Sequence, residues 1–280
     1  MNIGIVGLGL IGGSLGFDLR AAGHRVVGTS RQTETCNLAI ALGAVDAASP
    51  DLAILADAEV IFVCTPLGAM QSTVEQLLPY LAPHTVLTDV GSVKTQVVEA
   101  LEPLWLRFVG GHPMAGKETA GISAAQAHLF VERPYVLTPT TQTDLEAKAM
   151  VAGLIETIGS QYYECEPAQH DRAVALISHL PVMVSASLIA TCMQEPDANT
   201  LALAQALASS GFRDTSRVGG GNPELGRMMA QYNREELRRS LQLYRDSLDQ
   251  VIALIESSDW DALQAHLGQT SASRPKFVSE

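Results

Sequence analysis

Three polar clusters follow apolar segments that have the length and composition of buried strands, at residues 64–66, 89–94 and 110–116. The carboxyl ends of parallel strands meet at one edge of an open α/β sheet, and ligands bind beyond that edge. We therefore expect the three clusters to share a site. Two of their side chains, Ser92 and His112, carry groups that can handle a proton.

His112 is the strongest candidate for a general base. Gly110 and Gly111 precede it and Pro113 follows it, and a residue before proline favours an extended backbone. An imidazole with an ordinary pKa of about 6.5 can take a hydroxyl proton near neutral pH while a hydride leaves. Ser92 could donate or accept a hydrogen bond at the same carbinol. On the residues alone, a loop histidine of no chemical importance remains an equally good interpretation.

His179 and two arginines form a second candidate group. Pro181 lacks an N–H and displaces the carbonyl four residues earlier, so a helix around it should open near His179. A core histidine is the alternative. Arg213 and Arg217 lie in a segment predicted to join two helices, just before a glycine run. Because the planar guanidinium suits carboxylates, this segment is a candidate anion site, although one arginine on a solvated loop would be unremarkable.

Residues 7–12, GLGLIG, form a GxGxxG motif between an apolar strand and a helical pattern. In a dinucleotide-binding unit the glycines permit a tight turn, a close approach of the pyrophosphate and close packing of helix on strand. The N–H groups at the start of the helix then bind phosphate. The alternative is a glycine-rich turn without a ligand. The predicted cofactor contacts are Gly7, Gly9, Leu10, Ile11 and Gly12, with Thr65 and Pro66 from the first polar cluster.

The end of the second predicted strand selects between NAD and NADP. An NAD site places Asp or Glu there to bind the ribose hydroxyls. This chain has Ser30, Arg31 and Thr33 instead, with no acid before Glu34. Arginine can neutralise the 2′-phosphate that a carboxylate would repel. The pattern therefore predicts NADP, unless Arg31 is only a solvated surface charge.

Short apolar runs alternate with helical patterns up to about residue 166, and helical patterns alone follow. The alternation predicts an α/β chain with a doubly wound, mostly parallel sheet of Rossmann type over residues 1–166 and an all-helical domain over 167–280. The predicted strands are 3–6, 25–29, 60–63, 85–88, 107–109, 135–138 and 161–165; the predicted helices include 11–22, 70–81, 145–158, 171–193, 198–208 and 235–257. The last helix carries an apolar seam for another helix, and the polar tail 270–280 should fray.

The formal net charge of −12 disfavours a nucleic-acid or anionic-membrane partner, which would need a concentrated basic face. The four cysteines show no CxxC pair or zinc-type spacing, so no metal is expected. The chain starts without a secretory pattern and has no apolar run of membrane-spanning length free of Gly, Pro or charge. A cytoplasmic protein is the resulting expectation.

The motifs GLGLIGGSLG, DVGSVK, GGHPMAG and SHLP followed by GFRDTSR occur in an order and spacing that resembles the prephenate/arogenate dehydrogenase family of tyrosine biosynthesis. The likeness covers essentially the whole chain, and GGHPMAG together with DVGSVK is its specific part. The resemblance implies that His112 hydrogen-bonds the ring hydroxyl of the substrate. Ser92 would contact that hydroxyl and the nicotinamide region, and His179 would be a second active-site histidine.

The same resemblance implies that Arg217, or else Arg213, binds the ring carboxylate. Lys117 stands where many members have Ser or Thr, so it contacts either a substrate carboxylate or only solvent. The helical domain would form an intertwined homodimer. The reaction would be the oxidative decarboxylation of an anionic cyclohexadienol, with positioning and one proton relay supplied by the protein.

Among the possible substrates, L-arogenate is favoured, because a short NADP-type chain resembles the cyanobacterial and plant arogenate dehydrogenases. Prephenate, giving 4-hydroxyphenylpyruvate, is the first alternative. A β-hydroxyacid dehydrogenase or imine reductase is another, although no lysine precedes Lys276 in the second domain. A non-catalytic NADP-sensing regulator is disfavoured because both Ser92 and His112 are present.

Overall fold

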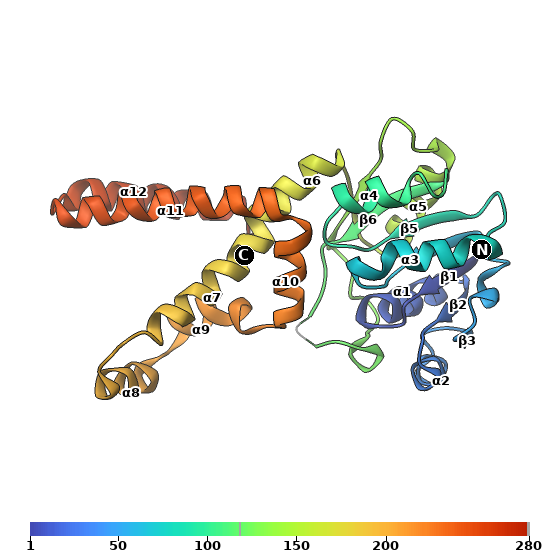
Figure 1. The fold of residues 1–280 in the computed structure, drawn as a ribbon, viewed down its shortest axis with the longest axis horizontal. Coiled ribbons are helices and arrows are strands. Elements are labelled where there is room, and N and C mark those ends of the chain that lie inside the picture. Colours follow the sequence, from blue (N-terminus) through green and yellow to red (C-terminus); the bar gives the residue numbers. More distant parts are fainter. Residues whose placement is uncertain (118, 279–280) are drawn as a thin grey trace. The chain divides into compact units, whose positions relative to one another are not determined.

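The computed structural model describes residues 1–117 and 119–278. Within them, eight strands form one sheet in the order β3-β2-β1-β4-β5-β6-β7-β8 (Figure 1). All neighbouring strands are parallel except β6 and β7. The doubly wound, mostly parallel sheet is thus confirmed. The strands are β1 Asn2–Val6, β2 Arg25–Thr29, β3 Ala47–Ser49, β4 Val60–Val63, β5 Val86–Asp89, β6 Phe108–Pro113, β7 Pro134–Thr138 and β8 Gln161–Glu164.

Helices cover both faces of the sheet, which explains why its central strands are apolar on both sides. Successive side chains of a strand point to opposite faces. Ile5 and Phe62 therefore pack with α1 (Leu10–Ala21), α2 (Thr33–Ala41) and α5 (Leu145–Thr157) in one core cluster. Ile61 and Leu87 pack with α3 (Leu67–Leu77) and α4 (Thr95–Leu101) in the other.

Two strands differ from the sequence prediction. β3 was not predicted, because its three small residues, Ala-Ala-Ser, carry no β-branched or aromatic signal. β6 continues four residues beyond the predicted end at Val109, since residues 110–113 pair antiparallel with β7. His112 is therefore part of a strand, and the prediction that it lies in a loop after the strand is wrong.

Only helices follow β8 in the described residues. The helix around Pro181 opens as expected, because α6 (Pro167–Val174) is joined to α7 (Leu180–Cys192) by a π-helical turn, Ala175–His179. Such turns are rare in proteins, and those that occur are often found at functional sites. The chain continues as α8 (Ala198–Leu207), α9 (Ser210–Ser216), a 3₁₀ turn (Arg217–Gly220) and α10 (Pro223–Tyr232).

One prediction for this region is wrong, and one helix was not predicted. The segment that carries Arg213 is the helix α9, not a connection. The glycine run ends at a further helix, α10, whose start is stabilised by the Asn222 side chain accepting a 2.9 Å hydrogen bond from the Glu224 N–H. Asn followed by Pro and Glu is a helix-start pattern, which the neighbouring glycines masked.

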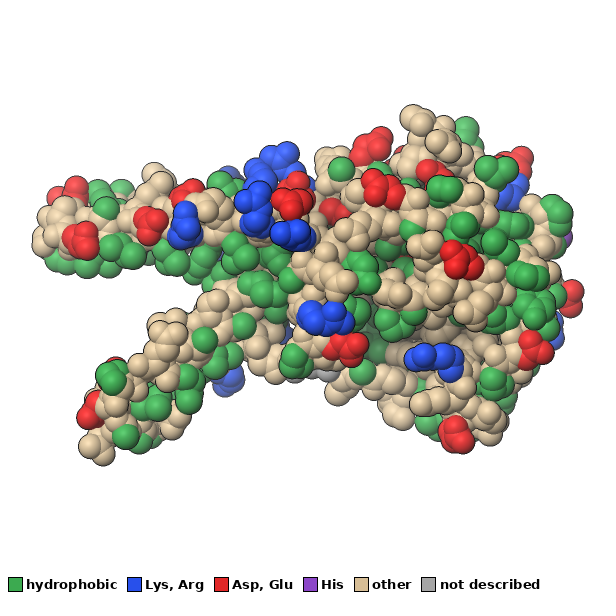
Figure 2. Space-filling view, in the orientation of Figure 1, with side chains coloured by type: hydrophobic (Ala, Val, Ile, Leu, Met, Phe, Trp, Pro, Cys, Tyr) green, Lys and Arg blue, Asp and Glu red, His purple; other side chains and the backbone are tan. Residues whose placement is uncertain are grey.

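By internal contacts the chain divides into residues 1–233 and 234–280, so the boundary expected between residues 166 and 167 stays a prediction. The second unit consists of α11 (Arg234–Glu256) and α12 (Trp260–Ser273), which pack on each other. Since α12 and a 3₁₀ turn reach Lys276, most of the tail expected to fray is helical. Hydrophobic side chains gather along one side of this pair (Figure 2). Four residues of the predicted seam on α11 are each more than a third exposed, namely Leu241, Tyr244, Leu248 and Ile255.

One described segment, Pro167–Cys192, is long and apolar enough to cross a membrane by length and composition. Its most apolar window has a mean hydropathy of 1.9 and is 22% buried. Pro181 interrupts that window. This composition is weak evidence for a membrane, because a helix that packs against another protein surface has the same character.

Candidate active site

The glycine motif forms the turn between β1 and α1. Gly7 has a φ of +102°, a conformation that L side chains rarely adopt, and a Cβ there would lie 2.7 Å from the Cys64 carbonyl oxygen. A Cβ on Gly12 would lie 2.1 Å from the Gly7 oxygen. Both positions therefore require glycine so that the turn, α1 and the end of β4 can approach one another.

The open side of this turn fits a dinucleotide. A Cβ on Gly9 would meet nothing within 4 Å, so space remains in front of the backbone at the start of α1. The Thr65 hydroxyl is buried and has no hydrogen-bond partner among the described residues. N–H groups at a helix start favour phosphate, and an unpaired buried hydroxyl is a position that a bound polar group would satisfy. Leu10 and Ile11 are half-buried in the first turn of α1, and Pro66 is exposed beside Thr65.

The end of β2 carries no carboxylate. Ser30 is half-buried directly after the strand, whereas Arg31 and Thr33 are exposed, with Thr33 at the first position of α2. A polar, cationic group of this kind is compatible with an anionic ligand at the strand end.

A buried ion pair holds the strand that carries His112. The β5–β6 ladder ends at Thr88 and Val109, which leaves the backbone groups of Gly111 without strand partners on this side. The Asp89 carboxylate accepts the Gly111 N–H at 3.0 Å, and Lys94 Nζ donates to the Gly111 carbonyl at 2.6 Å. Asp89 and Lys94 are fully buried and bond each other. Their side chains therefore continue the ladder up to the residue before His112.

His112 belongs to a three-residue chain of hydrogen bonds. Its Nδ1 lies 2.8 Å from Nε2 of His170, and Nδ1 of His170 lies 2.8 Å from Oδ1 of Asp171. The two imidazole rings meet edge to face, with centroids 5.0 Å apart. All three residues are buried, with His112 the most accessible at 9%. Nε2 of His112 makes no hydrogen bond within the described part of the chain.

His179 is linked to this hydrogen-bond chain through Asn233. Asn233 donates from its amide to the Asp171 carbonyl oxygen at 2.8 Å and lies 3.2 Å from Nδ1 of His179. Nε2 of His179 is buried and unpaired among the described residues. A neutral His179 with Nδ1 as acceptor therefore presents an unsatisfied N–H.

Burial sets the charge of these histidines. It is the largest effect that lowers the pKa of His112 well below its ordinary value, and the cationic forms of His170, Lys94 and His179 lower it further. Burial likewise lowers the pKa of His179 to about 4, against an opposing effect of Asp171. Both side chains are neutral at neutral pH, so each carries one N–H and one lone pair, and the lone pair of His179 faces the Asn233 amide.

The other predicted substrate residues lie in different settings. Ser92 is half-buried in the loop after β5, two residues before Lys94. Arg213 is exposed on α9 and pairs with Asp214 at 3.0 Å. Arg217 is exposed at the start of the 3₁₀ turn. Lys117 is exposed and donates to the Gln126 side chain, so its described contact is with the protein.

Sequence reasoning missed Asp89, Lys94, His170, Asp171 and Asn233. Two of them were within reach, because Asp89 and Lys94 are the outer residues of the same DVGSVK motif that supplied Ser92. His170 and Asp171 form an adjacent pair in the first helix after β8, but no spacing rule connects them with a strand 58 residues earlier.

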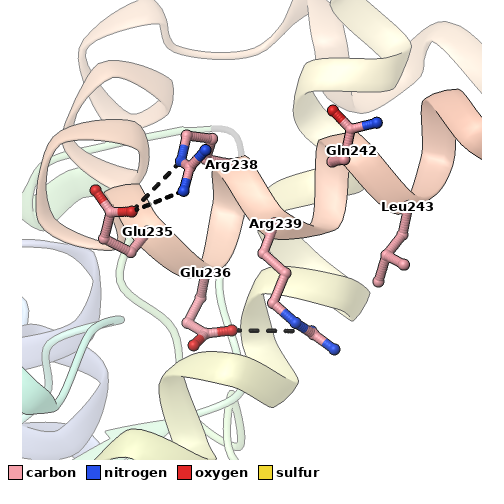
Figure 3. Close-up of a pocket in the computed structure, with 6 residues that line it drawn as sticks. All are labelled: Glu235, Glu236, Arg238, Arg239, Gln242 and Leu243. Atoms are coloured by element: carbon pink, nitrogen blue, oxygen red, sulfur yellow. Dashed lines mark hydrogen bonds and ion pairs between the residues drawn. The ribbon is translucent and has the colours of Figure 1, made fainter.

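A separate hollow on α11 is lined by Glu235, Glu236, Arg238, Arg239, Gln242 and Leu243 (Figure 3). Its charged side chains form ion pairs three residues apart along the helix, Glu235 with Arg238 at 3.3 Å and Glu236 with Arg239 at 3.9 Å. Pairs of this kind stabilise an exposed helix by well under about 1 kcal/mol. None of the predicted site residues lies in this hollow.

Two consecutive segments of the chain match domains of one known family. Residues 15–164 match the nucleotide-binding domain of prephenate dehydrogenase, and residues 166–269 match the dimerization domain of the same enzyme. The chain is 31% identical to prephenate dehydrogenase of Bacillus subtilis over 92% of its own length and 71% of that protein. It is 30% identical to cyclohexadienyl dehydrogenase of Zymomonas mobilis over 98% of its length and 94% of that protein.

Solved structures agree. The arogenate dehydrogenase of Synechocystis shares 54% of its residues with this chain, covers 99% of it over 100% of its own length, and superposes with a TM-score of 0.91. Prephenate dehydrogenase from Aquifex aeolicus, bound to hydroxyphenyl propionate and NAD⁺, is 28% identical to this chain. It covers 99% of the chain over 98% of its own length and superposes with a TM-score of 0.93. The chain therefore belongs to the prephenate dehydrogenase family of oxidoreductases.

Proposed function

We propose that this enzyme catalyses the NADP-dependent oxidative decarboxylation of L-arogenate to L-tyrosine as a cytoplasmic homodimer. The single observation that carries the proposal is the neutral, buried His112, whose Nε2 has no hydrogen-bond partner among the described residues and whose Nδ1 is held by His170. The 54% identity to an arogenate dehydrogenase supports arogenate as the substrate. Prephenate remains the alternative, since curated relatives carry that name.

His112 acts as the general base. Its Nε2 accepts the proton of the ring hydroxyl while the hydride leaves the same carbon, and Ser92 hydrogen-bonds that hydroxyl. Bound NADP supplies the hydride acceptor. The ketone that forms is conjugated with the quaternary ring carbon, so the ring carboxylate leaves as CO₂ and the ring becomes aromatic. The chain's residues therefore mainly bind, orient and move one proton.

Four cationic or donor side chains are the candidates for binding the substrate. Arg217 binds the ring carboxylate, with Arg213 as the second candidate, and the Nε2–H of His179 donates to an oxygen of the substrate. Lys117 is the remaining candidate for a carboxylate contact. Arg217→Ala should mainly raise KM, because a lost carboxylate contact weakens binding in the ground and transition states alike.

NADP is held at the glycine turn by Gly7, Gly9, Leu10, Ile11 and Gly12, and beside it by Thr65 and Pro66. Ser30, Arg31 and Thr33 bind the 2′-phosphate. The open space at Gly9 and the unpaired Thr65 hydroxyl support the binding of a dinucleotide. The absence of an acidic residue between the end of β2 and Glu34 supports NADP over NAD. Arg31→Ala should lower the NADP/NAD ratio of kcat/KM, and an unchanged ratio would show that Arg31 does not recognise the phosphate.

The homodimer forms through the part that matches a dimerization domain. The exposed apolar side chains of α11 and of α8, such as Leu248, Leu203 and Leu207, need a covering surface in water. A second copy supplies it.

The test is to follow NADPH formation with L-arogenate, prephenate and a 3-hydroxyacid in parallel. We expect the highest kcat/KM with arogenate. Activity only with prephenate would replace the substrate, and activity with neither cyclohexadienol would overturn the function. His112→Ala should abolish turnover while NADP affinity stays nearly intact; a large loss of cofactor binding would instead make His112 structural.

A further inference from the structure

We propose that His170 and Asp171 are positioning residues that fix the tautomer and orientation of His112, so that its Nε2 faces the substrate as a lone pair. The identity of His112 as the base rests on the proposed function. The arrangement itself rests on contacts that need no substrate.

The chain of hydrogen bonds starts at the carboxylate of Asp171, whose position is fixed by its own contacts. Oδ1 of Asp171 accepts the backbone N–H of Lys94 at 2.7 Å, and Oδ2 accepts that of Thr95 at 2.8 Å. Both N–H groups belong to the start of α4, where a helix leaves donors unpaired and favours negative charge. The Asn233 amide holds the Asp171 carbonyl from the other side. Asp171 therefore cannot rotate without losing several buried hydrogen bonds.

The carboxylate then decides where the proton of His170 lies. Burial acts to raise the pKa of Asp171, but the hydrogen bonds from His170, Lys94 and Thr95 outweigh it and lower the pKa, so the carboxyl group is ionised. An ionised carboxylate only accepts hydrogen bonds. Nδ1 of His170, 2.8 Å away, must therefore carry a proton and donate it.

A His170 that has its single proton on Nδ1 leaves Nε2 as an acceptor. The neighbouring atom, Nδ1 of His112 at 2.8 Å, then has to be the donor. A neutral His112 protonated on Nδ1 carries its lone pair on Nε2, which is the atom without a hydrogen bond in the described chain. A doubly protonated His170 would reverse this order and leave His112 without a base on that side.

The same chain stabilises the cation that forms during the reaction. When Nε2 of His112 takes up a proton, the positive charge is delocalised over the ring, and its Nδ1–H strengthens the bond to His170. The Asp171 carboxylate is the negative group at the end of this line. The arrangement follows the logic of a carboxylate that orients a catalytic imidazole, with a second imidazole inserted between the two.

Two variants of His170 separate orientation from mere packing. His170→Gln keeps an amide N–H toward Asp171 and a carbonyl oxygen toward His112, at a spacing similar to that of the two ring nitrogens. His170→Leu fills similar space without either group. We expect His170→Gln to retain kcat within about tenfold and His170→Leu to lose about 10²-fold or more, the usual contribution of a general base. The KM for NADP should change in neither, and the exposed His84→Gln is the matched control.

Imidazole ¹⁵N NMR on the ring-labelled protein, with His112 assigned by His112→Gln, reads the tautomer directly. In the wild-type protein at neutral pH we expect His112 to be protonated on Nδ1, and in His170→Leu to shift toward the Nε2–H form. A wild-type His112 protonated on Nε2, or a His170→Leu enzyme with wild-type kcat, would overturn the proposal. Because the NMR measurement needs no substrate, it decides the positioning role even if the assays of both cyclohexadienols failed.

Discussion

The carboxylate of Asp171 accepts a 2.7 Å hydrogen bond from the backbone N–H of Lys94, 77 positions earlier in the chain. Its second oxygen accepts the N–H of Thr95 at 2.8 Å. One side chain of α6 thus closes the open start of α4 while also bonding His170. The first helix after the sheet is thereby tied to the end of the loop that supplies Ser92, and His170 of the same helix bonds the candidate base.

Asp171→Asn should destabilise the fold by about 1–3 kcal/mol, because an amide N–H would face the Thr95 N–H and leave a buried donor unsatisfied. Urea denaturation followed by circular dichroism measures the change. Asp214→Asn is the control, since Asp214 is exposed and its ion pair in the described part of the chain is with exposed Arg213; it should change stability by less than about 0.5 kcal/mol. Equal losses in both variants would contradict the role of Asp171 in joining α4 and α6.

Asp171→Asn should also change how the free energy of unfolding depends on pH in the acid range. The pKa of Asp171 is lowered in the folded protein, where hydrogen bonds outweigh the effect of burial. Its stabilisation is therefore complete above the unfolded pKa of about 3.9 and is lost as pH falls below that value. Wild-type stability should drop more steeply than that of Asp171→Asn below about pH 4. Parallel curves would contradict the lowered pKa.

His179 predicts a second pH dependence at higher pH. Burial lowers its pKa to about 4 in the folded protein, whereas an unfolded histidine has a pKa of about 6.5. Between these values the unfolded chain binds the extra proton, so stability rises as pH increases from 4 to 6.5. A shift of this size corresponds to about 3 kcal/mol.

His179→Gln should remove much of that slope, and the exposed His128→Gln should leave it unchanged. Free energies of unfolding at several pH values between 4 and 7 provide the test. A His179→Gln protein with the wild-type slope would mean that His179 titrates normally in the fold.

Gly9 and Gly12 should respond to alanine in different ways. A Cβ on Gly12 would lie 2.1 Å from the Gly7 oxygen, so Gly12→Ala must displace the turn and lower the apo melting temperature. A Cβ on Gly9 meets nothing within 4 Å, so Gly9→Ala should leave apo stability nearly unchanged and weaken NADP binding by about tenfold or more. Calorimetric titration and thermal unfolding distinguish the two, and tight binding by Gly9→Ala would argue against pyrophosphate at this turn.

The Asp89–Lys94 pair should be strongly coupled. Burial lowers the pKa of Lys94, and Asp89 opposes this effect. Lys94→Met would leave a fully buried carboxylate unpaired, at a cost of about 3–5 kcal/mol. Adding Asp89→Asn to Lys94→Met should recover part of that loss, as a double-mutant cycle in urea would show. Additive losses would mean that the two side chains do not act as a pair.

Local sequence patterns were sufficient to predict features whose contacts lie within a short stretch of the chain. The glycine turn, the apolar strands and the helix opening before Pro181 depend on residues close in sequence, so spacing predicted them. The helical tail was missed because its apolar periodicity is weak, and α10 was missed because the glycines before it masked its start. His112 was placed in a loop because only the antiparallel partner β7, more than twenty residues later, makes it part of a strand.

The chain of side chains behind His112 depends on tertiary placement. Asp171 and His170 are unremarkable as a sequence pair, and only the packing of α6 against the start of α4 brings them to the sheet. Lys94 and Asp89 bond the backbone of Gly111 because the β5–β6 ladder ends before that residue. Such long-range contacts are set by packing and not by spacing.

The most direct test of the central claim is the stoichiometry of one reaction. The wild-type protein, L-arogenate and NADP are incubated, and NADPH, CO₂ and L-tyrosine are measured together. We expect the three products in equal amounts, and none of them with His112→Ala. NADPH formed without equivalent CO₂ and L-tyrosine would contradict an oxidative decarboxylation and leave only a different dehydrogenase reaction.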